Sequence, residues 1–240
     1  MDGRVTPPQL LLGGLVDDAG LFPPSSLPMA DALARHGSSQ HPMLSGRFLC
    51  PADRVDELLD ALADDEQLEI HLIGDDVSLL DDLRVMVKAV ESRSVIATEL
   101  DCYVEGVVPS ELVGTNAFGK LRCGGAQIPP VDEVAHYVTE CVRHDVAFKA
   151  TAGMHAAVRG WESTGDQPHH GYLNLLLAVA RALSGRDVET VLASTDADSL
   201  AAEAKAVDVD LAGATRGLFH SYGSCDTVRP VRDAEQLGLL

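Results

Sequence analysis

The sequence predicts an α/β protein, a (β/α)8 barrel of the TIM type formed as one domain by residues 1–240. Short apolar segments alternate with longer amphipathic segments almost from end to end, which is typical of parallel βα units. Eight strand-like segments can be counted, and 240 residues of 46% apolar composition suffice for one barrel. An open doubly wound sheet is the alternative, but no Gly-rich phosphate-loop motif follows the first strand.

The expected strands are short, apolar and rich in β-branched residues, and most of them end at polar or glycine residues. They are Gln9–Val16, Gly46–Cys50, Leu68–Ile73, Val95–Val104, Ala117–Cys123, Val146–Ala150, Thr190–Ala193 and Gly217–His220.

The expected helices show apolar residues three and four positions apart. In the first of them Val55, Leu58, Leu59 and Leu62 share one face. The proline pair before residue 131 is a typical helix start, and Ser184-Gly185 ends an almost wholly apolar helix. The predicted helices are Ala52–Ala63, Val77–Ser92, Pro109–Val113, Val131–His144, Gly171–Leu183 and Ser199–Val207.

One long segment between a strand and a helix has the composition of a loop. Gly160–Gly171 contains Gly, Ser, Thr, Asp and Pro, and it follows the strand that carries Lys149. In a barrel this is the position of a lid over the active site. We therefore expect residues 160–171 to be mobile and close to the site.

Charge and cysteine content exclude several classes of protein. The chain has 37 acidic and 18 basic residues, a formal charge of −19, which argues against binding to nucleic acid or to anionic membranes. Five cysteines form no CxxC pair and are odd in number, so neither a zinc site nor a disulfide framework is indicated. Without a signal peptide or an apolar run of about 20 residues, we expect a cytoplasmic protein.

Two of the four lysines, Lys120 and Lys149, lie inside short apolar segments that are expected to be strands. An amine in such a place must be desolvated, paired or chemically used. Because side chains alternate along a strand, Lys120 shares a face with Arg122, and Lys149 shares one with Thr151. Asp101 lies on an earlier strand. If these faces line the barrel, Lys120, Lys149 and Asp101 meet in one pocket at the carboxyl ends of the strands.

The same rule selects candidate substrate-binding residues at strand ends. Arg122 offers a bidentate fork to a carboxylate or phosphate, and the turn Ser221–Ser224 offers backbone N–H groups, although it could equally be an ordinary glycine turn. His155 is placed to hydrogen-bond a substrate. The set is Arg122, Asp17, Thr151, His155, Ser221 and Ser224.

Such a cluster of amines and carboxylates has a mechanistic interpretation. A lysine beside a second cation in a dry pocket becomes nucleophilic at neutral pH and can form a Schiff base with a carbonyl compound. A nearby carboxylate can then transfer protons. The alternative is that Lys120 and Lys149 are structural ion-pair partners of Asp101 or Glu105.

Four stretches resemble the class I aldolase barrels, most of all deoxyribose-phosphate aldolase. They are Val16–Pro24, Glu99–Val104, Gly119–Gly125 and Phe148–Met154. The resemblance implies a lyase in which Lys120 forms the Schiff base, Lys149 makes Lys120 a better nucleophile, and Asp101 relays protons. The same stretches also resemble bacterial barrel proteins of no assigned activity.

The expected function is thus an aldolase-type lyase acting on a small anionic carbonyl compound without a cofactor, with the oligomeric state open. A non-covalent isomerase or lyase using the lysines as electrostatic stabilisers is one alternative, and a noncatalytic anion-binding barrel is another. A metal site of His155, His169 and His170 with Asp17 or Glu105 would make a hydrolase or a lyase. No HxH or HExxH spacing supports such a site, so no metal is predicted. His36, His41 and His71 are expected on the surface.

Overall fold

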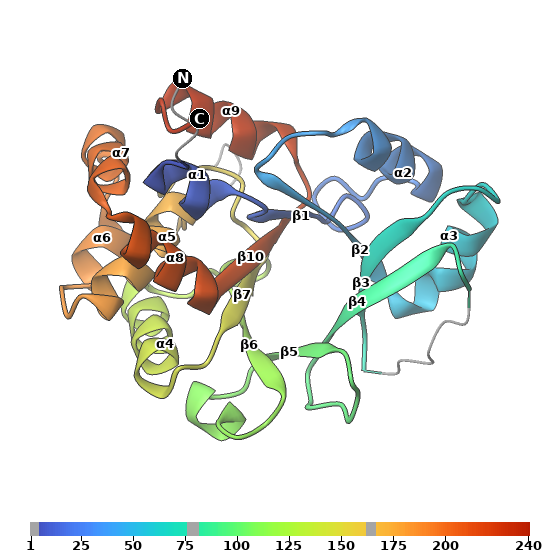
Figure 1. The fold of residues 1–240 in the computed structure, drawn as a ribbon, viewed down its shortest axis with the longest axis horizontal. Coiled ribbons are helices and arrows are strands. Elements are labelled where there is room, and N and C mark those ends of the chain that lie inside the picture. The colour runs from blue at the N-terminus through green and yellow to red at the C-terminus, as the bar shows by residue number, and fades with distance from the viewer. Residues whose placement is uncertain (1–4, 76–81, 162–166) are drawn as a thin grey trace.

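The computed structural model describes residues 5–75, 82–161 and 167–240. Eight parallel strands close into a barrel in the order β1, β10, β7, β6, β5, β4, β3, β2 (Figure 1). The prediction of a (β/α)8 barrel is confirmed. The barrel strands are β1 (Val16–Asp18), β2 (Leu44–Pro51), β3 (Leu68–Ile73), β4 (Val85–Ser92), β5 (Asp101–Glu105), β6 (Ala117–Arg122), β7 (Phe148–Thr151) and β10 (Phe219–Ser224).

Helices cover the outside of the barrel. Figure 1 shows α4 to α8 gathered beside β6, β7 and β10, and α2 and α3 on the opposite side, beside β2 and β3. The helices are α1 (Pro7–Leu12), α2 (Met29–Ser38), α3 (Val55–Ala61), α4 (Val131–His144), α5 (Tyr172–Leu183), α6 (Glu189–Ala193), α7 (Ala197–Ala206), α8 (Val209–Leu218) and α9 (Val228–Gln236), with short 3₁₀ turns η1 (Ala52–Arg54) and η2 (Pro109–Leu112). In the described part of the chain, no helix has both the length and the apolarity that a membrane crossing requires.

The apolar core lies between the strands and the helices. The larger cluster packs α5, which is buried along most of its length, against β7 and β10, with Phe148 and Phe219 at its centre. A smaller cluster packs Phe48 and Ile70 of β2 and β3 against α2 and α3. Because side chains alternate along each strand, the residues between these outward positions point into the barrel. Several of these inward positions hold buried polar or charged side chains.

The first predicted strand, Gln9–Val16, is mostly wrong, because residues 7–12 form α1 and only Val16–Asp18 pair as β1. Local capping explains the difference. Thr6 accepts from the Gln9 N–H while the Gln9 side chain accepts from the Thr6 N–H, and Pro7 occupies the first turn. This capping box initiates a helix in an apolar run that resembles a strand.

Two further elements were assigned the wrong type. The predicted helix Val77–Ser92 contains β4 at 85–92, and its residues 77–81 lie outside the described part of the chain. The predicted strand Thr190–Ala193 is α6, whose first turn is held by the Asp187 carboxylate accepting from the Thr190 N–H. Pairing with β3 and β5 decided the first case, and a local cap decided the second.

The predicted lid contains a short antiparallel hairpin of β8 (Gly160–Trp161) and β9 (Pro168–His169), which follows β7. Residues 162–166 lie outside the described residues. Ring nitrogens of His169 and His170 lie 3.3 Å from the Gly153 carbonyl and 2.8 Å from the Pro129 carbonyl. The hairpin thus packs against the loops after β6 and β7, at the carboxyl end of the barrel.

Candidate active site inside the barrel

The ammonium group of Lys149 lies at the centre of the barrel, fully buried. Its Nζ donates to Asp17 Oδ2 at 2.7 Å and to Glu91 Oε1, and it lies 3.3 Å from His71 Nδ1. Asp17, His71 and Glu91 are themselves buried and come from β1, β3 and β4. Three strands distant in sequence therefore supply the partners of one lysine.

These contacts belong to a longer chain of alternating charges that crosses the barrel. Arg47 Nη1 lies 3.1 Å from Asp17, Lys120 Nζ lies 3.0 Å from Glu91 Oε2, and Glu105 lies 3.6 Å from Lys120 and 2.6 Å from Arg122 Nε. In order, the members of this ion chain are Arg47, Asp17, Lys149, Glu91, Lys120, Glu105 and Arg122. Each carboxylate in the ion chain contacts a cation on both sides.

The ion pairs keep the buried groups charged. Burial alone would raise the pKa of Asp17, but Lys149 and the other neighbouring cations outweigh it and lower that pKa to about 2. For Glu91, too, burial is outweighed by Lys149 and Lys120, so its pKa falls well below its usual range. Burial would lower the pKa of Lys149, yet Asp17 and Glu91 raise it. Lys149 is therefore a fixed cation at neutral pH.

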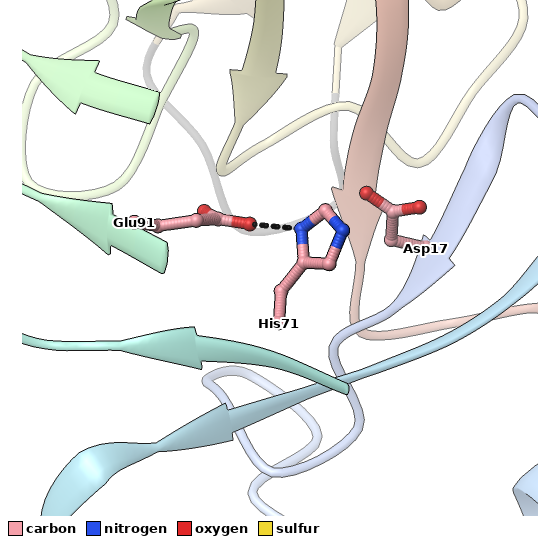
Figure 2. A group of neighbouring side chains, drawn as sticks. All are labelled: Asp17, His71 and Glu91. Carbon is pink, nitrogen blue, oxygen red and sulfur yellow. Dashed lines mark hydrogen bonds and ion pairs between the residues drawn. The ribbon is translucent and has the colours of Figure 1, made fainter. Parts of the chain in front are cut away.

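Asp17, His71 and Glu91 also have the composition of a metal site (Figure 2). In the described part of the chain they are the one group of three such residues whose ligand atoms lie within 4.8 Å of one another. Figure 2 shows His71 between the two carboxylates. However, Lys149 Nζ contacts all three, so an ammonium ion already occupies the position of a cation. The arrangement favours lysine chemistry over metal binding.

Exposure increases from the centre of the barrel toward the carboxyl ends of the strands. The side chain of Lys120 is 7% exposed, that of Glu105 21% and that of Arg122 50%. Arg122 also borders a cavity of about 800 Å³ formed with the loop 125–130 after β6 and with His169 of the β8–β9 hairpin. Lys120 and Lys149 are register partners on β6 and β7, and of these two lysines only Lys120 retains exposed side-chain surface.

Asp101 does not meet the lysines, so the prediction that it converges with them is wrong. It is the first residue of β5 and is exposed, whereas Glu105, at the other end of β5, pairs in register with Lys120. Four residues of strand correspond to about 13 Å. The error arose because alternation fixes the face of a strand but not the height along it. Glu91, Asp17 and Glu105 supply the carboxylates instead.

The other predicted residues are distributed between the site and its surroundings. Ser221 Oγ donates to Asp17 Oδ2 at 2.7 Å, so it supports the ion chain. Thr151 ends β7 near the mouth and is half-buried. Ser224 Oγ donates to the Asp226 carbonyl and so stabilises its own turn. The alternative metal site of His155, His169 and His170 is not formed in the described part of the chain. His155 lies 3.8 Å from Cys225 Sγ, while His169 and His170 contact the carbonyl oxygens of loop residues.

Sequence reasoning missed Glu91, His71 and Arg47. Glu91 was hidden in the predicted helix Val77–Ser92, although the run Val85, Val87 and Val90 is a strand signal. His71 was expected on the surface, which is wrong, because it is only 3% exposed. It lies in a correctly predicted strand, so alternation with outward-facing Ile70 and Leu72 could have placed it inside.

No protein-family model, curated protein or solved structure matches the chain. The resemblance to class I aldolases therefore remains a hypothesis based on short motifs, and the functional argument depends on the geometry of the barrel interior.

Proposed function

We propose that the protein is a lyase of the class I aldolase type, in which Lys120 forms a Schiff base with a small anionic carbonyl compound. The observation that carries the proposal is that two interior lysines share one carboxylate, Glu91, and of the two only Lys120, which is 7% exposed, retains exposed side-chain surface. A lysine nucleophile is activated by a cationic neighbour or by a water-poor pocket. Lys149 supplies the cation.

Charge balance supports the choice of Lys120 as the nucleophile. The ion chain has four cationic side chains and three carboxylates, so it carries one excess positive charge. With Lys120 as a neutral amine, three cations face three carboxylates. Lys149 is less suited to lose its proton, because two buried carboxylates bind it and raise its pKa. One proton can thus leave at Lys120 without leaving a carboxylate unpaired.

In the proposed reaction, each charged residue around Lys120 has a defined step. The neutral Lys120 amine adds to the substrate carbonyl carbon, the carbinolamine hydroxyl takes up one proton from solvent and leaves as water, and Glu91 balances the charge of the resulting iminium ion. Glu105 accepts the proton of the substrate hydroxyl two carbons from the iminium carbon. The bond between the hydroxyl-bearing carbon and the carbon next to the iminium carbon then breaks, the hydroxyl-bearing fragment leaves as a carbonyl compound, and the bonding electrons form an enamine. Protonation of the enamine carbon and hydrolysis release the product and restore Lys120. Arg122, beside the cavity, holds the anionic group.

Borohydride trapping tests this function. The protein is incubated with small anionic aldehydes and ketones and sodium borohydride, and the covalent adduct is located by peptide mass mapping. We expect an adduct on Lys120, none in Lys120→Ala, and a normal adduct in the control Lys205→Ala, which changes an exposed lysine on α7. Glu105→Gln should still form the adduct but should reduce turnover by about 10² or more. Adducts on Lys205 or Lys88 alone would contradict the proposal.

A non-covalent isomerase or lyase is the second candidate. It is favoured by the full pairing of Lys149 and by its raised pKa, which suit a permanent cation that stabilises an enolate. In that case activity on a carbonyl substrate would persist without any borohydride adduct, and Lys149→Met would abolish activity while Lys120→Ala would only reduce it.

A further inference from the structure

A second cavity opens at the amino ends of the barrel strands, opposite the proposed active site. Its volume is about 500 Å³. Asp101 is the first residue of β5, and His220 is the second residue of β10, so both mark this end. The cavity extends to His71 and Tyr103. The rings of both residues lie beside the ammonium group of Lys149. Its wall is polar, although this end of a barrel usually contributes only to stability.

Arg216 is the most informative residue of this cavity. Its guanidinium group donates to the carbonyl oxygens of Phe219 at 2.5 Å and Gly13 at 3.2 Å, and among residues 5–75, 82–161 and 167–240 no carboxylate lies within 4.0 Å of it. Burial lowers the pKa of Arg216 to about 10, so it is still a cation at neutral pH. A mostly buried arginine without a carboxylate beside an open cavity is placed to bind an anion.

The other charged residues of the cavity indicate which functional groups the anion carries. Arg47 adds a second cation, 30% exposed, while Lys88 is paired with Glu69 at 3.2 Å. Asp101 is an acceptor on the same wall, and its side chain forms no hydrogen bond or ion pair with a described residue. A carboxylate facing an arginine pair would repel a plain anion, but it would accept a hydrogen bond from a hydroxyl group.

We propose that this cavity binds a small hydroxylated organic anion, a carboxylate or a phosphate, with Arg216 and Arg47 on the anionic group and Asp101 on a hydroxyl. The site is independent of the proposed lyase function, because it lies at the other end of the barrel and includes none of its reacting groups. It is nevertheless linked to the ion chain. Arg47 contacts Asp17, which holds Lys149, so an anion that draws Arg47 toward the cavity weakens one contact of that carboxylate.

Isothermal titration calorimetry on the full chain tests the site. The probes are sodium phosphate and sodium malate, each at an ionic strength held constant with NaCl. We expect saturable binding of at least one of them, and the tighter probe tells whether the site prefers phosphate or carboxylate. Arg216→Gln should weaken binding by about tenfold or more. Asp101→Asn should tighten phosphate binding about threefold by removing a like charge, a gain that misfolding cannot produce.

Two matched variants separate this cavity from other sources of binding. Arg143→Gln removes an exposed arginine of α4 that is 70% exposed, and Arg122→Gln removes the arginine at the opposite mouth. Arg143→Gln should leave the affinity unchanged, and Arg122→Gln shows whether any of the measured binding belongs to the opposite mouth. If Arg216→Gln does not fold, Lys88→Gln, an exposed change on the same wall, should weaken binding about threefold. The proposal fails if neither probe saturates, if Arg122→Gln rather than Arg216→Gln removes binding, or if Arg143→Gln has an equal effect.

Discussion

Replacing Lys149 by methionine tests how much the ion chain contributes to stability. Methionine is one heavy atom shorter than lysine and keeps its unbranched shape, but it leaves Asp17 and Glu91 without their shared cation. Lowering the pKa of Asp17 from 3.8 to about 2 corresponds to about 2 kcal/mol. Breaking a buried pair generally costs about 3–5 kcal/mol. Because Asp17 keeps Arg47 and Glu91 keeps Lys120, we expect a loss near 3 kcal/mol at pH 7.

The pH dependence distinguishes this electrostatic loss from a packing defect. In the wild type, the lowered pKa values of Asp17 and Glu91 give stability that is complete above their unfolded values, near 4, and is lost as the pH falls toward 2. In Lys149→Met, the remaining cations offset the burial of Asp17 and Glu91 less completely, so the pKa values of both carboxyl groups rise. Protonation of these groups at lower pH then removes the cost of burying an unpaired charge in the folded state. The difference in unfolding free energy should therefore shrink between pH 7 and pH 4.

Urea denaturation followed by circular dichroism at 222 nm measures this difference at each pH. The matched control is Lys88→Met on β4, whose lysine is 41% exposed and pairs with Glu69, so its effect should stay within about 1 kcal/mol at every pH. For a chain of this size, 3 kcal/mol corresponds to a melting shift of roughly 6–12 °C. A loss that is independent of pH, or no larger than that of the control, would refute the argument.

Two further predictions concern backbone and thiols. Gly153→Ala should cost about 1–2 kcal/mol of stability, because Gly153 has φ +73° and an added Cβ would lie 3.0 Å from the backbone after β6. The control Gly37→Ala, in open space on α2, should stabilise the protein by up to about 1 kcal/mol. Equal melting temperatures of the two variants would contradict this prediction. Burial would raise the pKa of Cys225, but hydrogen bonds with His155 and Ser25 together outweigh it, so that this pKa is lowered. For Cys123, burial raises the pKa to about 12. Iodoacetamide at neutral pH should therefore label Cys225 before Cys123, His155→Ala should slow that labelling, and faster modification of Cys123 would be inconsistent with these environments.

The sequence alone was sufficient to predict the barrel, because the alternation of strands and amphipathic helices extends over the whole chain and depends on local periodicity. Helix Val131–His144 agrees with α4 at both ends, since a proline pair starts it and its apolar stripe packs on β6 and β7. Local periodicity also placed Lys120 and Lys149 on inward-facing positions of neighbouring strands. Each of these conclusions needs only a segment and its immediate neighbours.

The tertiary structure alone decided which charges meet inside the barrel. Asp17 and Lys149 are 132 residues apart, and Glu91 joins the two lysines only because closure of the barrel brings β4, three strands away from β7, to face it across the interior. The height of Asp101 along its strand depends on the stagger between strands, which no segment encodes by itself. Periodicity gives the direction of a side chain, but its partners depend on register and closure, and these are properties of the assembled sheet.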